Sequence, residues 1–164
     1  MMMLDDAQSI IIPGHGLALA QAQHILHTLE KALIKKGARV RYAIHPCAGR
    51  KPGHMNILLT EVKVPHDLLF DLDAINDDFQ NTDVALIVGA NDIINSEACA
   101  VNNSPLYGMS VLNADKARTV IVCKRSLKPG FSGVDNKIFY NPKTRMIFGD
   151  AKESIAEMLK LLNT

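Results

Sequence analysis

The stretch that most constrains the fold of this 164-residue chain is residues 9–20, which read S-I-I-I-P-G-H-G-L-A-L-A. A β-branched run meets a proline and a glycine turn at residues 14–16, and a long amphipathic stretch begins immediately after it. β-Branched residues favour strands, and glycines permit a tight turn. The order of strand, glycine turn and helix is typical of the first turn of a dinucleotide-binding fold, although an ordinary strand-to-helix turn has the same ingredients.

The glycine spacing carries the chemical part of this prediction. Gly14 and Gly16 match the first two glycines of the motif G-x-G-x-x-G, and Ala18 and Leu19 follow them. One glycine allows the turn, the second lets a pyrophosphate approach the backbone, and a small residue lets helix and strand pack closely. Unpaired N–H groups and the helix dipole are then expected to face an anion.

Length and composition fit one soluble domain. Apolar residues make up 48% of the chain and charged residues 21%, and a net charge of +1 gives no reason to expect nucleic-acid or membrane-surface binding. We find neither an apolar run long enough to span a bilayer nor a signal peptide. We expect residues 1–8 to be a disordered or added N-terminal segment and residues 9–164 to form a single domain.

The cysteines and histidines indicate no metal site. Cys47, Cys99 and Cys123 are scattered, which favours a reducing compartment, and Cys123 lies in an apolar run where it is expected to be buried and inert. His24 and His27 have the spacing of metal ligands. Because no further ligand converges on them, an exposed helix face is the favoured interpretation.

Periodicity predicts alternating helices and strands. Residues 17–36 predict a helix capped by Gly37, and residues 40–44 predict a second strand that pairs in parallel with the first through a right-handed crossover. The further predicted elements are a helix at 55–61, a strand or extended piece at 67–72, a helical turn at 74–79, buried strands at 84–88 and 119–123, an extended stretch at 111–112, a last strand at either 137–140 or 146–148, and a closing helix after a capping box at Asp150 and Glu153.

Candidate ligand-binding residues follow the strands, where open parallel sheets bind their ligands. The second strand ends at His45-Pro46 without the acid that many NAD sites use, which leaves NADP open. Residues 45–54 contain two glycines and two cations, and they fit either a second wall against phosphate or a solvated crossover loop. Asp92, in G-A-N-D, is either a functional residue or a cap.

A cationic triplet follows the strand at 119–123. Lys124, Arg125 and Ser126 are the residue types that hold a phosphomonoester, although basic residues at strand ends are also common. The glycine turn, the basic loop, the Asp92 loop and this triplet all lie near strand carboxyl ends. Together with the missing acid, they favour NADP(H) over NAD(H).

Six strings, in the same order over residues 9–162, carry a family resemblance. They are P-G-H-G-L-A-L-A-Q-A-Q, Y-A-I-H-P-C-A-G-R-K-P-G-H-M-N, V-G-A-N-D, S-P-L-Y-G-M, K-R-S and F-G-D-A-K. The chain resembles the NADP(H)-binding component, domain III of the beta subunit, of proton-translocating NAD(P) transhydrogenase.

The resemblance implies an α/β fold, a Rossmann-like open parallel sheet of about six strands with helices on both faces, and NADP(H) as the cofactor. It implies that the cofactor-binding residues are Gly14, His15, Gly16, Leu17, Ala18 and Ala20 at the dinucleotide, Ala48, Gly49, Arg50, Pro52 and Gly53 at the pyrophosphate, Gly89, Ala90, Asn91 and Asp92 on the nicotinamide side, Lys124, Arg125 and Ser126 at the 2′-phosphate, and Gly130, Phe131, Ser132, Gly133 and Val134 in a lid. Asp92 and His45 are proposed for proton coupling, and no covalent or acid/base catalyst is expected.

Two residues depart from the family pattern. His15 and Phe131 stand where the family often has tyrosine. His15 adds a titratable group beside a phosphate site, and Phe131 removes a hydroxyl from the lid.

The resemblance also implies a place in a larger enzyme. NADH on a partner, the NAD(H)-binding domain I, would reduce NADP⁺ bound here, and a transmembrane domain II would conduct the proton. The chain would then be inactive in hydride exchange without its partner, and it would be a soluble part of an inner-membrane complex, dimeric as a whole, facing the bacterial cytoplasm or the mitochondrial matrix. The alternative is a non-catalytic NADP(H) sensor or a domain of a thiamine- or flavin-type enzyme.

Overall fold

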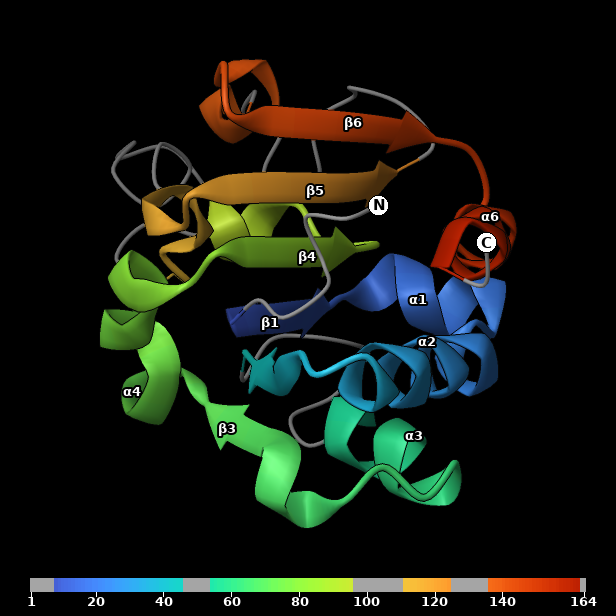
Figure 1. The fold of residues 1–164 in the computed structure, drawn as a ribbon. Helices are drawn as coiled ribbons and strands as arrows, with labels where there is room; N and C mark the ends of the chain where they lie inside the picture. The colour runs from blue at the N-terminus through green and yellow to red at the C-terminus, as the bar shows by residue number, and fades with distance from the viewer. Residues whose placement is uncertain (1–7, 46–53, 96–110, 125–135, 163–164) are drawn as a thin grey trace.

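The computed structural model describes residues 8–45, 54–95, 111–124 and 136–162. They form one six-stranded sheet with the strand order β3-β2-β1-β4-β5-β6, and every pair of neighbouring strands is parallel (Figure 1). The strands are β1 (Gln8–Pro13), β2 (Arg39–Ile44), β3 (Leu69–Asp71), β4 (Val84–Val88), β5 (Thr119–Lys124) and β6 (Thr144–Phe148). This order is that of the Rossmann doubly wound fold, so the predicted fold class is confirmed.

The centre of the sheet is apolar because its strands are covered on both faces. Every residue of β4 is buried, and the three isoleucines of β1 are fully buried. Continuous apolar runs are what central parallel strands require, and the sequence predicted β1, β2, β4 and β5 to within one or two residues. The order reverses direction between β1 and β4, which therefore flank the switch point where such sheets bind ligands.

The helix predicted at residues 17–36 is in fact two helices, α1 (His15–Ala20) and α2 (Gln23–Lys35). Gln21 separates them in a left-handed conformation with φ of 51°. The N–H groups of Gln21 and Ala22 donate to the carbonyls of Ala18 and Leu17, and this pattern is a Schellman motif. The prediction was wrong here because alanine and glutamine are good helix formers, so nothing local indicated a break.

Gly37 ends α2 as predicted. Its φ is 99°, and the N–H of Ala38 donates to the carbonyl of Leu33. One face of α2 is buried in the core through Leu26, Leu29 and Leu33. This burial agrees with the apolar periodicity of the sequence.

Among the remaining elements, the helix α3 (His54–Glu61) agrees with the prediction, and the others are shorter than predicted or have a different secondary structure. The strand β3 keeps only three residues of the stretch 67–72. A helical turn, α4 (Leu72–Ile75), continues into the 3-10 helix Asn76–Asn81. Residues 111–112 have no regular structure, and the last strand is β6, since residues 137–140 form a 3-10 helix.

The closing helix, α6 (Ala151–Leu162), begins after Asp150, whose Oδ2 accepts from the N–H of Lys152 at 3.1 Å. This bond satisfies one of the free donors at the start of a helix. In Figure 1, α6 lies beside α1 and α2, and it contacts both helices. Ile155 and Met158 bury its inner face.

Across the described part of the chain, no helix combines the length and the apolar character that crossing a bilayer requires.

Candidate functional site

The carboxyl ends of the central strands meet at one edge of the sheet. Pro13 of β1 pairs with Val88 of β4, and Val88 pairs with Cys123 of β5. Hydrogen bonding continues one residue further, because the N–H of Gly14 donates to the carbonyl of Val88 at 2.9 Å and that of Gly89 donates to Cys123 at 3.2 Å. The glycine turn, the loop after β4 and the end of β5 are therefore adjacent.

The glycines of the first turn make room for the β4 loop. A Cβ on Gly14 would lie 2.6 Å from the Cα of Ala90, and one on Gly16 would lie 2.7 Å from the Cα of Gly89. Gly89 itself has φ of 70°, and its own Cβ would lie 2.4 Å from the nitrogen of Leu17. Real Cβ atoms do not come this close to backbone atoms. The two segments can therefore pack this closely only with glycine at positions 14, 16 and 89.

This packing corrects part of the sequence interpretation. The N–H groups of Gly14, Gly16 and Leu17 were expected to be unpaired, yet they donate to the carbonyls of Val88, Gly89 and Gly14 at 2.9, 2.9 and 3.0 Å. The space left by the missing side chain of Gly16 is likewise taken by Gly89. The turn is thus fixed by the protein itself, and any anion would have to use other donors.

The loop after β4 is closed by Asn91. Its carbonyl accepts from the N–H of Ile94 at 3.1 Å, which forms the 3-10 helix Asp92–Ile94. Ile93 and Ile94 are buried beneath it. Asp92 thus stands at the start of a defined turn at the carboxyl edge of the sheet.

Asn136 is a residue that the sequence interpretation did not single out. It is 3% exposed, and its Nδ2 donates to the carbonyl oxygen of Asn91 at 3.0 Å and to Oδ1 of Asn91 at 3.2 Å. It also caps the 3-10 helix Lys137–Tyr140 by accepting from the N–H of Ile138. The cap role had a local signal, an asparagine before a short helix. The contact with Asn91 had none, because 45 positions separate the two residues.

Lys124 lies at the end of β5, where the sequence placed it. Its Nζ is 5.6 Å from the centre of the Phe139 ring, within the range of a cation–π contact, and its carbonyl accepts from the N–H of Gly149 at 3.0 Å. Arg125 and Ser126 lie outside the described residues, as do residues 48–53 and 130–134. Their predicted roles remain predictions.

His45 follows β2 directly and is 3% exposed. β2 neighbours β1 on the side away from β4, so His45 lies at the same sheet edge as the glycine turn. The structure thus brings together the described members of the predicted site: the glycine turn, the loop at Gly89–Asp92, Lys124 and His45.

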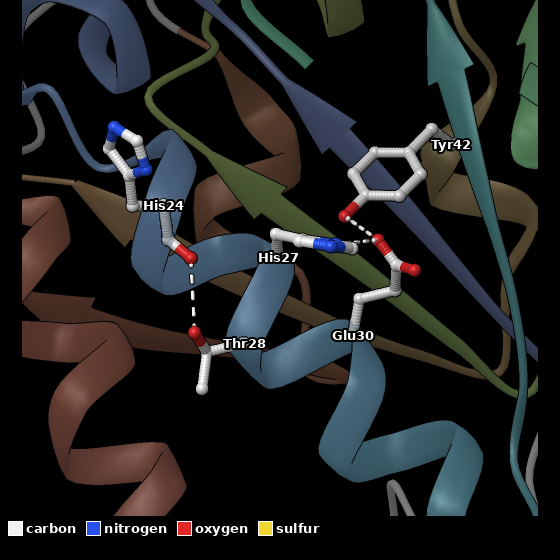
Figure 2. A network of polar contacts seen from close by, with 5 residues as sticks. All are labelled: His24, His27, Thr28, Glu30 and Tyr42. Atoms are coloured by element: carbon white, nitrogen blue, oxygen red, sulfur yellow. Dashed lines mark hydrogen bonds and ion pairs between the residues drawn. The ribbon is translucent and has the colours of Figure 1, made fainter. Parts of the chain in front are cut away.

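A second polar cluster lies between α2 and β2, shown in Figure 2. Glu30 is 1% exposed, and its Oε1 accepts from the hydroxyl of Tyr42 at 2.8 Å and lies 3.0 Å from Nδ1 of His27. His27 therefore does not lie on an exposed helix face, which corrects the sequence interpretation, whereas His24 is exposed. The side chains in the described ranges form no group of three or more potential metal ligands.

Tyr42 and Cys123, both among the described residues, have raised pKa values. Burial, reinforced by the charge of Glu30 and the hydrogen bond to it, raises the pKa of Tyr42 well above its ordinary value. Burial also raises the pKa of the Cys123 thiol to about 12. The expectation that Cys123 is buried is confirmed.

Comparison with known proteins gives one family. The family model of the NAD(P) transhydrogenase beta subunit matches residues 1–161. The beta subunit from Rhodospirillum rubrum, and the sequence of the same subunit from one named strain of that species, are each 48% identical to this chain over 161 residues, which is 98% of the chain and 35% of the relative. The chain therefore spans about a third of the length of these relatives.

A solved structure shares the fold. A putative thiamin diphosphate-dependent enzyme from Mycobacterium smegmatis superposes with a TM-score of 0.54 at 13% identity, covering 96% of this chain and 26% of that one. At this identity the likeness concerns the fold alone.

Proposed function

Because this chain belongs to the NAD(P) transhydrogenase beta subunit family, we propose that it is the NADP(H)-binding domain of a proton-translocating transhydrogenase. NADP⁺ held here would be reduced by hydride from NADH on a partner domain. The nicotinamide rings supply that chemistry when bound, and this chain supplies orientation and electrostatics.

The observation that carries the proposal is the meeting of the glycine turn and the Gly89 loop beside the switch point between β1 and β4. Ligands of doubly wound sheets bind in the crevice at that position. The N–H groups of Gly14, Gly16 and Leu17 already have protein partners. Recognition of the cofactor therefore falls to the neighbouring side chains, Asn91 on the β4 loop and Lys124 on β5, together with the predicted residues after them.

The preference for NADP(H) rests on two features. β2 runs into His45-Pro46 and not into an acid that would accept from the ribose 2′-hydroxyl. Lys124, at the end of β5, begins the cationic triplet, and Arg125 and Ser126 are proposed to hold the 2′-phosphate with it. An arginine fork and a lysine point charge suit a phosphate dianion.

Isothermal titration of this domain with NADPH and NADH tests the proposal. Loss of a charge-assisted bond costs about 1.5–3 kcal/mol, so Arg125→Ala should weaken NADPH roughly 10- to 150-fold and leave NADH unchanged. Arg39→Ala is the matched control, because Arg39 is an exposed cation at the opposite, amino end of β2. Equal affinities of the unaltered domain for the two nucleotides would refute the assignment.

Hydride exchange tests the enzymatic part. We propose that domain I docks on this domain, that a membrane domain II completes a dimeric complex facing the bacterial cytoplasm or mitochondrial matrix, and that this domain alone is inactive. Mixing it with purified domain I should produce transfer between nicotinamide analogues. Tight NADPH binding without any transfer would favour a sensor.

Asp92 and His45 are proposed to couple nucleotide state to the proton. Asp92→Asn should alter the pH dependence of NADP(H) release more than it alters folding. Release rates measured from pH 5 to 9, with urea unfolding in parallel, check this. Unchanged release in the variant would remove Asp92 from the coupling.

A further inference from the structure

Asn136 joins two parts of the chain that carry different strands. Its carboxamide is buried and makes three hydrogen bonds, two from Nδ2 to Asn91 and one to Oδ1 from the N–H of Ile138. The nitrogen of the amide therefore donates, and its oxygen accepts. This arrangement requires a side chain that carries a donor and an acceptor side by side.

The bonds to Asn91 fix more than one atom. The carbonyl of Asn91 accepts from Asn136 and also from Ile94, so the same oxygen anchors the turn that starts at Asp92. The Oδ1 of Asn91 is the second acceptor. Because its oxygen end faces the donor of Asn136, the Asn91 amide is held in one of its two flip states, which sets where its own N–H₂ points.

We propose that Asn136 is a positioning residue for the nicotinamide end of bound NADP(H), acting through Asn91 and the turn at Asp92. This inference rests on the proposed function, in which that loop faces the nicotinamide half of the cofactor. Asn136 itself touches no cofactor. Its role is to keep the Asn91 amide and the Asp92 turn in the orientation that the ring meets.

Asn136→Asp is the sharpest variant because it replaces the amide N–H₂ by an oxygen and leaves the shape of the side chain nearly unchanged. A carboxylate still accepts from the N–H of Ile138, but it offers no donor to the two oxygens of Asn91. Asn136→Ser keeps a capping oxygen and adds no charge. It removes the amide N–H₂ that reaches Asn91 and leaves only a hydroxyl donor on a side chain one atom shorter. Asn141→Asp is the matched control, because Asn141 Oδ1 accepts from the N–H of Lys143 at 3.1 Å beyond the other end of the same 3-10 helix.

The ligand pair separates positioning from general loosening. NADPH carries the nicotinamide, whereas 2′,5′-ADP carries only the adenosine end with its 2′-phosphate. Because two hydrogen bonds to Asn91 are lost and a carboxylate faces its oxygens, Asn136→Asp should weaken NADPH about 5- to 100-fold and should change 2′,5′-ADP affinity by less than about 2-fold. Asn136→Ser should give the same pattern, and Asn141→Asp should change neither affinity.

The outcomes are distinct. Equal weakening of both ligands would assign Asn136 a purely structural role and overturn the inference, as would unchanged NADPH binding in both variants. If Asn136→Asp fails to fold, the measurement on Asn136→Ser decides in the same way. If the unaltered domain binds neither ligand, the proposed function itself fails, and the inference fails with it.

Discussion

The hydroxyl of Tyr42 donates a 2.8 Å hydrogen bond to the carboxylate of Glu30, and both side chains are buried between β2 and α2. A buried carboxylate is tolerated only when its lone pairs are satisfied. Here Tyr42 donates to Glu30, and Nδ1 of His27 lies 3.0 Å from the same oxygen (Figure 2). The pair therefore helps to fix the position of α2 against the sheet.

Tyr42→Phe should lower the free energy of unfolding by about 2 kcal/mol at pH 8, because a hydrogen bond to a charged, buried group is lost. The loss should shrink above pH 10. The folded pKa of Tyr42 is raised, so its contribution is complete below the unfolded value of about 10 and declines as pH rises toward the folded value. Urea unfolding at pH 8 and 10.5 measures both effects.

Tyr140→Phe is the control for this prediction, because Tyr140 is 61% exposed. It should be neutral at both pH values. If Tyr42→Phe and the unaltered chain lose stability in parallel between pH 8 and 10.5, the raised pKa does not contribute.

Cys123 should be unreactive in the native protein. The thiolate is the reactive form, and a pKa of about 12 leaves almost none of it at pH 8. In a background with Cys47→Ser and Cys99→Ser, a thiol reagent such as Ellman's should modify Cys123 only at the rate of unfolding, and at full speed in urea. Rapid modification without urea would contradict its burial.

The raised pKa of Cys123 also affects stability. The contribution of the buried thiol to the free energy of unfolding is complete below about pH 9 and falls as pH rises toward about 12.

The sheet was predictable from sequence because its central strands are continuous apolar runs, as in residues 84–88. Glu30 was harder to place. It lies on α2, four residues after Leu26 and three before Leu33, on the apolar face. The hydroxyl that donates to it comes from Tyr42 on β2, 12 positions away. Gln21 has no local signal, because glutamine is a good helix former and yet it ends α1 in a left-handed conformation. Asn136 illustrates the same limit, because the residue it positions is distant in sequence.

Gly16→Ala should destabilise the domain by about 3 kcal/mol or prevent folding, because its Cβ would lie 2.7 Å from the Cα of Gly89 and neither backbone segment can move away easily. NADPH binding should fall with it if the two segments form the site.

Gly149→Ala is the control that separates the steric effect of an added Cβ from the cost of the backbone conformation. There the nearest atom is Ser154 Oγ at 3.8 Å, and only the φ of 136° opposes the change. If Gly16→Ala lowers the free energy of unfolding by less than Gly149→Ala does, the turn has room for a Cβ at position 16 and the steric argument is wrong.

Lys63→Gly should raise the free energy of unfolding by about 0.5–1 kcal/mol. Lys63 has φ of 70° and ends α3 in a Schellman motif, in which the N–H of Val64 donates to the carbonyl of Leu59 at 3.0 Å. A left-handed conformation strains any side chain with a Cβ, and Lys63 is exposed, so little packing is lost with its side chain. The greater freedom of glycine in the unfolded chain offsets part of the gain.

Gly37→Ala is the reciprocal change at the equivalent position of α2 and should lower the free energy of unfolding by about 1 kcal/mol. Denaturant unfolding of both variants gives the comparison, and a loss of stability in Lys63→Gly would mean that the lysine side chain stabilises the folded state by more than its backbone strain costs.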